Sequence, residues 1–214
     1  MKLSIIIPMY NEQESLDALF MELSGLFSQE AKTEIIFIND GSSDNTLSIL
    51  ESKIKNYPSW KVINLYRNYG KSVALQAGFD NSKGEIIATM DADLQDNPKE
   101  IYNLIKELEK GYDVVSGWKK NRKDPLEKKI PSKIFNFFVR VFSGLKIHDS
   151  NCGLKVFKRE VTEMLTLYGG RHRYIPLLAH QKKFLISEVV VDHREREFGV
   201  SKYGVKRYSD GFFD

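Results

Sequence analysis

The 214-residue sequence predicts an α/β protein with a mostly parallel sheet and helices on both faces. Short β-branched runs alternate with amphipathic stretches, and polar segments follow the runs. The length fits one large domain. The predicted strands are Leu3–Ile7, Glu34–Asn39, Lys61–Leu65, Glu85–Met90, Asp113–Ser116 and Phe184–Val191. The predicted helices between the first five strands are Glu12–Phe27, Asp44–Asn56, Lys71–Asn81 and Pro98–Lys110.

Polar side chains follow four of these strands. Ligands of such sheets bind beyond the carboxyl ends of the strands, so these side chains are predicted to meet at one edge. The candidates, in chain order, are Tyr10, Glu12, Asp40, Lys71, Asp91 and Asp93. The polar residues of these segments also have ordinary alternative roles: they can form turns, cap a helix, as Ser43 or Asp44 would, or be an exposed lysine.

The segment Met90–Gln95, of sequence Met-Asp-Ala-Asp-Leu-Gln, has two interpretations. In an extended backbone, Asp91 and Asp93 project to the same side, and Gln95 adds an amide oxygen in the same register. Such oxygen ligands suit Mg²⁺ or Mn²⁺, whose remaining positions water or phosphate fills. Alternatively, the two carboxylates only form a turn. The following Asp96 is predicted to cap the next helix, with a proline near its first turn.

Charge divides the chain into two halves. Residues 1–118 carry 11 Lys and Arg against 18 Asp and Glu, whereas residues 119–214 carry 21 against 11. The basic half indicates an anionic partner such as phosphate, a membrane surface or nucleic acid, or else a solvated basic face.

The single cysteine, Cys152, excludes an intramolecular disulfide. We find neither a signal-peptide pattern nor an apolar run of the roughly 18 residues that a spanning helix needs.

Several common sites are excluded by their missing motifs. No Gly-x-Gly-x-x-Gly follows a strand, no Gly-x-Ser-x-Gly is present, and the four histidines lack metalloprotease spacing.

The segments that remain occur in a characteristic order. They are Ile7–Glu12, Asn39–Thr46, Asn68–Lys71 with Ala74 and Gly78, Asp91–Gln95 and Arg196–Lys202. In this order they resemble the family-2 inverting glycosyltransferases of the Rossmann-like GT-A fold, over roughly residues 3–210. Asp-Leu-Gln and the late segment resemble the polyprenyl-phosphate branch, which includes dolichol-phosphate mannosyltransferases and undecaprenyl-phosphate glycosyltransferases.

The resemblance implies roles for individual residues. Asp93 and Gln95 match the ligands of Mg²⁺ or Mn²⁺, and Asp93 is also a predicted catalytic residue. Asp91 matches the first carboxylate of the motif, near the ribose and the metal, and is a further candidate metal ligand. The donor-binding residues implied are Pro8, Tyr10, Glu12, Asp40, Lys71, Asp91, Arg196, Ser201 and Lys202. The first three belong to the base and ribose pocket, Asp40 contacts the base, and the last three close over the phosphates.

The second half, 119–214, is predicted to form the acceptor side of the catalytic domain, and 1–118 the nucleotide-sugar side. Arg171 and Arg173 match a basic loop that binds the acceptor phosphate, although an ordinary solvated turn is the alternative. Asp149 matches a carboxylate proposed as catalytic base, but the sequence departs from the family pattern at Cys152–Lys155. A helix at 131–144 has the aromatic and lysine content of a membrane-interface helix, or it packs as a core helix.

The predicted function is metal-dependent, inverting transfer of a sugar from a UDP- or GDP-sugar to a polyprenyl phosphate. This hexosyltransferase would act at the cytoplasmic face of a membrane, without nucleic acid. The alternatives are a family-2 transferase acting on a sugar hydroxyl and a non-enzymatic nucleotide-sugar-binding module. Many members of the branch continue into transmembrane helices, so we expect this chain to stop short of them.

Overall fold

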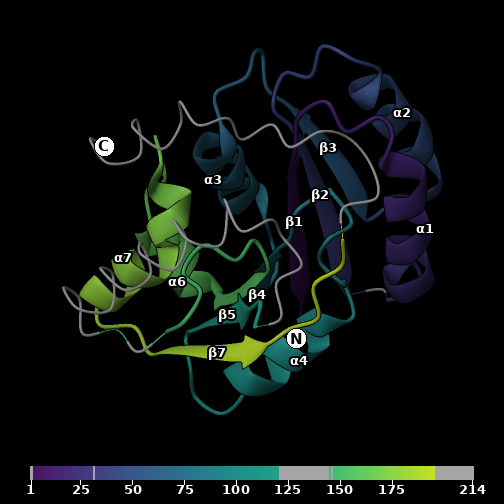
Figure 1. Ribbon diagram of the computed structural model, residues 1–214. Coiled ribbons are helices and arrows are strands. Elements are labelled where there is room, and N and C mark those ends of the chain that lie inside the picture. The colour runs from purple at the N-terminus through teal and green to yellow at the C-terminus, as the bar shows by residue number, and fades with distance from the viewer. Residues whose placement is uncertain (1, 31, 121–144, 146, 196–214) are drawn as a thin grey trace.

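A seven-stranded sheet forms the centre of the protein in the computed structural model, which describes residues 2–30, 32–120, 145 and 147–195. The strand order is β3-β2-β1-β4-β6-β5-β7. Figure 1 labels each of these strands except β6. All neighbouring strands are parallel except that β6 runs antiparallel to both β4 and β5. The strands are β1 (Leu3–Met9), β2 (Thr33–Asn39), β3 (Trp60–Asn64), β4 (Ile86–Thr89), β5 (Val114–Trp118), β6 (Lys155–Lys158) and β7 (Ile186–Val190). Strands from both halves of the chain therefore share one sheet.

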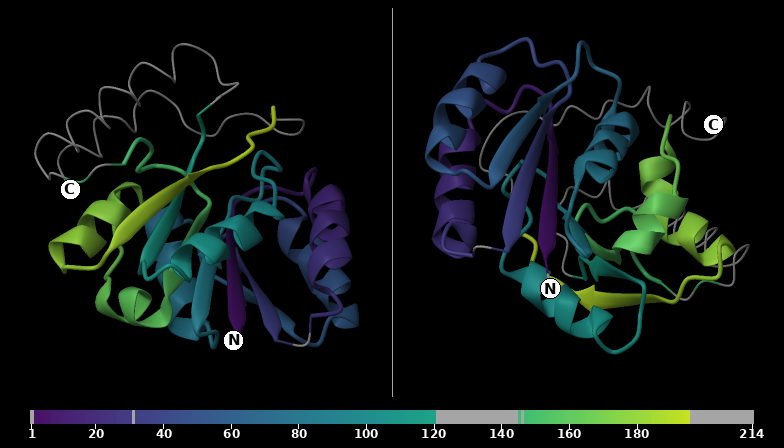
Figure 2. Two further views of the ribbon diagram at one scale, coloured as in Figure 1. Left: turned by 90° about the horizontal axis from the view of Figure 1, so that it is seen from below. Right: turned by 180° about the vertical axis from the view of Figure 1, so that it is seen from behind.

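Helices cover both faces of the sheet. Strands β1 and β2 are buried along their whole length, and alternate residues enter two different cores. Ile5 and Ile7 pack towards α1 (Leu16–Phe27), α2 (Thr46–Lys53) and α4 (Glu100–Leu108). Ile6 packs on the other face, whose helices are α3 (Lys71–Asn81), α6 (Arg159–Met164) and α7 (Ile175–Gln181). Figure 2 shows α1 and α2 at one end of the molecule and α6 and α7 at the other.

Helix α3 lies tightly against β1. A Cβ atom on Gly78 would come within 2.3 Å of Ile6 Cγ2, so only glycine allows this close approach. The helix begins at Lys71, after Gly70 with φ +92°, and ends at Asn81, as predicted. Its N-terminus is therefore fixed at the edge of the sheet where β1 to β4 end.

The predicted fold class is confirmed, and all six predicted strands are present. Strand β6, helices α6 and α7 and the short 3₁₀ helix η2 (Arg171–Tyr174) were not predicted. A second 3₁₀ helix, η1 (Ile54–Asn56), forms the last three residues of the predicted second helix. Three helices begin later than predicted, at Leu16 rather than Glu12, at Thr46 rather than Asp44 and at Glu100 rather than Pro98. Among the described residues, no helix has the length and apolar character that crossing a bilayer requires.

Gly25 lies in the interior of α1, and a Cβ atom there would meet nothing within 4 Å. Glycine in a helix interior costs roughly 0.5–1 kcal/mol relative to alanine. We therefore expect Gly25→Ala to raise the free energy of unfolding by about that amount. Urea denaturation of the two proteins measures it, and a destabilised variant would contradict the open space around this position.

Candidate functional site

The loops after β1 and β2 are joined by hydrogen bonds. The Asn11 backbone N–H donates to Ser42 Oγ at 2.9 Å, and the Ser43 N–H donates to Asn11 Oδ1 at 2.8 Å. One residue on, the Glu12 N–H donates to Thr46 Oγ1 at 2.9 Å. These bonds keep residues 10–15 in a loop, which explains why α1 does not begin at Glu12. Two predicted donor-binding residues, Tyr10 and Glu12, consequently lie on a loop bound to the one that follows Asp40, whereas Pro8 is buried within β1.

Asp40 joins the loop after β2 to the loop after β3. Its two carboxylate oxygens accept the backbone N–H groups of Tyr69 and Gly70 at 2.8 and 2.9 Å. At the adjacent Gly41, with φ +65°, a Cβ atom would lie 2.3 Å from the carbonyl carbon of Arg67. The buried Asp40 carboxylate thus fixes the turn that starts α3, and its predicted contact with a base stays a prediction.

Lys71, the first residue of α3, forms an ion pair with Asp91 in the loop after β4. The Asp91 side chain is 31% exposed. Burial acts to raise its pKa, but the positive charges of Lys71 and Lys119 oppose this effect. The net result is a pKa lowered to about 2. Asp91 is therefore ionised at neutral pH. The ion pair brings the fourth strand end beside the other three, as the sequence predicts.

Asp93 and Gln95 lie on a bent loop rather than on an extended strand. Strand β4 ends at Thr89, and Leu94 has φ +61°. Asp93 Oδ1 accepts the Gln95 backbone N–H at 3.3 Å, and Gln95 Nε2 donates to the Arg194 carbonyl at 3.4 Å. The prediction that an extended backbone aligns these side chains is wrong, because the turn at Leu94 interrupts it.

The donor set of this loop fits a cation held only partly by protein. Within the described ranges, no group of three His, Cys, Asp or Glu side chains could hold a metal ion. The loop offers two carboxylates and an amide oxygen, which are hard ligands of the kind that Mg²⁺ and Mn²⁺ take together with phosphate oxygens. The loop therefore fits a metal–phosphate complex better than a metal alone.

Gly153 packs directly against the Asp91 carboxylate. A Cβ atom at this position would lie 2.5 Å from Asp91 Oδ2. The Gly153 carbonyl accepts a hydrogen bond from Thr89 Oγ1 at 2.8 Å, which ties it to the end of β4. The departure from the family pattern at Cys152–Lys155 thus puts the smallest residue where the carboxylate needs space.

Two lysines of the basic half are buried rather than solvated. Lys119 lies 2.8 Å from the buried Asp96 carboxylate, whose charge helps to raise the lysine pKa although burial opposes this. Lys155 donates to the Cys152 carbonyl, and burial lowers its pKa. Asp96 is therefore an ion-pair partner, and the prediction that it caps the next helix is wrong. The N-cap residue of α4 is Lys99.

Asp149 is buried beside this cluster, with 3% of its surface exposed. Among the described residues, neither carboxylate oxygen has a hydrogen-bond partner. Its negative charge raises the pKa of Lys155, against the effect of burial. A general base must reach the proton that it removes. The predicted role of Asp149 as base stays a prediction.

The two arginines predicted to bind the acceptor, Arg171 and Arg173, lie on η2, which contacts the start of α3. Arg171 stacks on the Tyr168 ring with its guanidinium carbon 3.8 Å from the centroid, while the charge of Arg173 acts on His172. His172 contacts Ser72 in the first turn of α3. The structure thus brings the arginine segment next to the Lys71–Asp91 pair, and phosphate binding by these arginines stays a prediction.

His172 is expected to make stability fall in mildly acidic solution. Burial, together with the charges of Lys71 and Arg173, lowers its pKa well below 6.5. Near that pH the unfolded chain binds a proton that the folded protein does not, so the contribution of His172 to stability is complete above pH 6.5 and declines below it. We expect His172→Asn to flatten this dependence by up to about 1.4 kcal/mol per pH unit. Urea unfolding at neutral and at mildly acidic pH measures it, with His180→Asn as control; equal slopes in wild type and His172→Asn would contradict the assignment.

The last described residues pair with the predicted metal loop. The Arg194 N–H donates to the Gln95 carbonyl at 2.9 Å, and His193 forms a β-bridge with Asp96. The chain that leads to the late motif therefore runs beside Gln95. Arg196, Ser201, Lys202 and the 131–144 helix lie outside the described residues.

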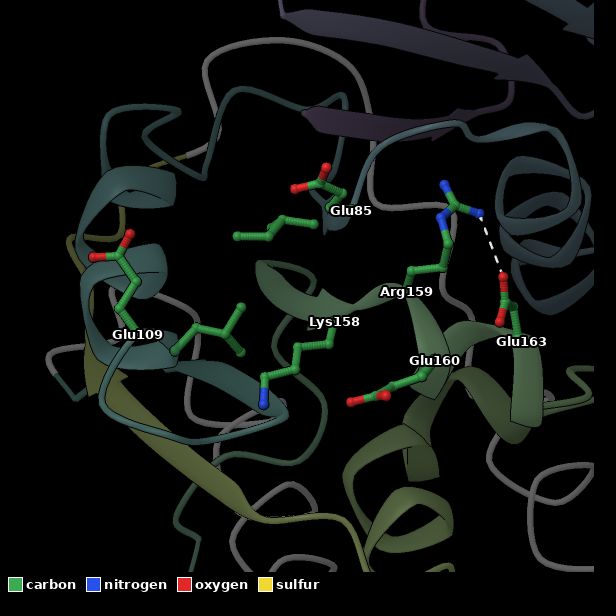
Figure 3. Close-up of a pocket in the computed structure, with 8 residues that line it drawn as sticks. Glu85, Glu109, Lys158, Arg159, Glu160 and Glu163 are labelled. Carbon is green, nitrogen blue, oxygen red and sulfur yellow. Dashed lines mark ion pairs between the residues drawn. The ribbon is translucent and has the colours of Figure 1, made fainter. Parts of the chain in front are cut away.

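A separate pocket of about 480 Å³ lies at the opposite edge of the sheet (Figure 3). It is found where β4 begins, at Ile86, and where β6 ends, at Lys158. Its other lining residues are Glu85, Leu108, Glu109, Arg159, Glu160 and Glu163. None of the predicted site residues lines it, so it is no part of the candidate site.

Sequence reasoning missed four residues at the candidate site, namely Ser72, Lys119, Gly153 and His172. For Gly153 there was a signal, because it interrupts the family pattern. The other three act through partners that are distant in the sequence, and no local pattern reveals such partners.

Comparisons with known proteins agree with this geometry. Residues 4–166 match the family described as Glycosyl transferase family 2. The chain is 38% identical to a dodecaprenyl-phosphate galacturonate synthase of Rhizobium johnstonii, over 97% of this chain and 63% of the relative. It is also 38% identical to an undecaprenyl-phosphate 4-deoxy-4-formamido-L-arabinose transferase of Pseudomonas syringae, over 99% of this chain and 63% of the relative. The chain thus spans just under two thirds of the length of these curated relatives.

Solved structures share the fold. A mannosyltransferase of Pyrobaculum calidifontis, in complex with GDP-mannose and Mn²⁺, has a TM-score of 0.71 at 19% identity, covering 94% of this chain and 58% of its own. A glucosyl-3-phosphoglycerate synthase of Mycobacterium tuberculosis, in complex with Mn²⁺ and UDP-glucose, has a TM-score of 0.69 at 19% identity, covering 92% and 72%. These similarities establish the architecture of the sheet and its helices.

Proposed function

Because the chain belongs to glycosyl transferase family 2, we propose that it transfers a sugar from a nucleotide diphosphate sugar to a polyprenyl phosphate. The observation that carries the proposal is the series of contacts that joins the four strand-end loops to one another and ends at the pair of Lys71 with the ionised Asp91. The curated relatives named above use dodecaprenyl or undecaprenyl phosphate, which supports a lipid phosphate acceptor here. Action at the cytoplasmic face of a membrane is part of the proposal.

In this reaction the acceptor phosphate oxygen attacks the anomeric carbon, the bond from that carbon to the nucleotide diphosphate breaks, and the configuration inverts. We assign Tyr10, Glu12 and Asp40 to the nucleoside and Lys71 with Asp91 to the ribose and diphosphate side. A Mg²⁺ or Mn²⁺ ion bound by Asp93 and Gln95 would supply Lewis-acid neutralisation of the leaving diphosphate. Arg196, Ser201 and Lys202, which follow the segment paired with Gln95, are assigned to the same phosphates.

The acceptor side is assigned to Arg171 and Arg173. A phosphate monoester is already largely ionised at neutral pH, because its second pKa is about 6. It therefore needs little deprotonation before it attacks, whereas a sugar hydroxyl needs a general base. The buried position of Asp149 is compatible with a phosphate acceptor, for which a strong base is not required.

The test is a panel of UDP- and GDP-sugars incubated with the protein, Mg²⁺ or Mn²⁺, and a short-chain polyprenyl phosphate. We expect a glycosyl polyprenyl phosphate, identified by its mass, and no product when the metal is chelated. In parallel reactions with a glycan acceptor in place of the lipid, transfer to a sugar hydroxyl without any transfer to polyprenyl phosphate would overturn the acceptor assignment. Binding of a nucleotide sugar without transfer to any acceptor would identify a binding module instead.

A further inference from the structure

The start of α3 and the arginine segment η2 are joined by two hydrogen bonds to one hydroxyl. The His172 backbone N–H donates to Ser72 Oγ at 3.0 Å, and His172 Nδ1 lies 2.9 Å from the same oxygen. Ser72 is 1% exposed and is the second residue of α3. Residues 100 positions apart in the sequence are thereby held together at a partly buried contact.

This contact lies between the two sides of the candidate site. Ser72 follows Lys71, whose ammonium pairs with Asp91. His172 lies between Arg171 and Arg173, the two candidate acceptor ligands. Any shift between α3 and η2 would therefore move the acceptor arginines relative to the donor side.

The hydrogen bonds are all satisfied by one neutral form of the imidazole ring. Ser72 Oγ accepts the backbone N–H of His172, so its own hydroxyl proton is available to Nδ1. In this form Nδ1 is the acceptor, and the ring carries its proton on Nε2. Burial and the nearby Lys71 keep the pKa of His172 low, which agrees with a neutral ring.

We propose that Ser72 and His172 are positioning residues that hold the acceptor arginines in register with the donor site. The proposal rests on the proposed function, since it concerns binding of a lipid phosphate next to a nucleotide sugar. An effective transfer needs the attacking phosphate oxygen close to the anomeric carbon, and this distance depends on how η2 sits on α3.

Helix α3 offers a matched control. Gln76, one turn further along, accepts the backbone N–H of Leu167 at 2.8 Å through its Oε1 atom. This bond also ties α3 to the segment that leads into η2, but it does not adjoin the Lys71–Asp91 pair. Gln76→Ala therefore removes a structural tie of similar kind without loosening the contact at the site.

The experiment measures transfer kinetics with polyprenyl phosphate and, by calorimetry, binding of the nucleotide diphosphate. We expect Ser72→Ala to raise the KM for the acceptor about tenfold, the effect of losing a buried hydrogen bond, and to leave nucleotide affinity within about twofold. Ser72→Thr keeps the hydroxyl and should restore the acceptor KM, and Gln76→Ala should not change it. If Ser72→Ala does not fold, His172→Phe takes its place as the disrupting variant. His172→Asn then serves as the rescuing variant, because its amide oxygen can take the place of Nδ1.

An unchanged acceptor KM in folded Ser72→Ala, or an equal increase in Gln76→Ala, would overturn the positioning role. The wild-type protein separates this outcome from failure of the proposed function. A wild type that glycosylates no polyprenyl phosphate contradicts the function, whereas an active wild type with an unaffected Ser72→Ala variant contradicts only the positioning role.

Discussion

Replacing Asp93 with alanine is expected to abolish sugar transfer, with a loss of about 10³-fold or more in kcat. Negative charge grows on the nucleotide diphosphate as its bond to the sugar breaks, and Asp93 is the carboxylate assigned to hold the cation that neutralises this charge. Without Asp93, the loop would offer the cation only the amide oxygen of Gln95 and the Asp91 carboxylate, which is already paired with Lys71. Transfer assays with saturating Mg²⁺ or Mn²⁺ measure the effect.

The matched control for Asp93 is Asp80→Ala, which removes an exposed carboxylate at the far end of α3. We expect this variant to keep wild-type turnover. Calorimetry of nucleotide binding, with and without Mn²⁺, adds a second measurement, because the metal dependence of binding should disappear in Asp93→Ala. Near wild-type turnover in folded Asp93→Ala would refute the assignment of the metal site.

Gly153→Ala is expected to lower activity about 10²-fold, the effect that a misplacement of about 1 Å at a reaction site can have. The added methyl group would lie 2.5 Å from Asp91 Oδ2, so either the carboxylate or the backbone at 153 must move. The carboxylate lies at the end of a side chain and moves more easily, and its movement breaks the ion pair with Lys71. Steady-state kinetics, compared with unfolding by urea, separates this effect from a general loss of stability.

The variant Gly25→Ala is the control, since it makes the same chemical change in open space on α1. Its activity should equal that of the wild type. If Gly153→Ala also kept full activity, the close approach of Gly153 to Asp91 would have no functional consequence.

The parts of the fold that depend on local sequence were predictable. Helix α3 was predicted with both ends correct because a glycine with positive φ starts it and its small residues, such as Gly78, fit against β1. Strand β6, by contrast, has only four residues and a lysine at each end. Its strand character comes from antiparallel pairing with β4 and β5, and pairing between distant segments leaves no local pattern.

The candidate site shows the same division. The strand-end rule correctly brings Asp91 beside Lys71, because it depends only on where parallel strands end. It does not distinguish Asp96, which the sequence presents as a helix cap, from a buried partner of Lys119. Net charge was also an incomplete guide, since Lys119 and Lys155 of the basic half belong to the interior.

The reversed direction of β6 has a consequence for how this protein family can vary. The chain leaves the sheet at the end of β5 and returns at the start of β6, where Ser116 pairs with Lys155 and the Gly117 N–H donates to the Leu154 carbonyl at 2.9 Å. The points at which the chain leaves the sheet and returns to it are therefore neighbours in one ladder. Doubling the length of such a closed segment costs only about 0.6 kcal/mol in loop entropy. The connection between β5 and β6 can thus be lengthened or replaced, and with it the segment around Gly153 that packs on Asp91, while the pairing of β1 to β4 stays unchanged.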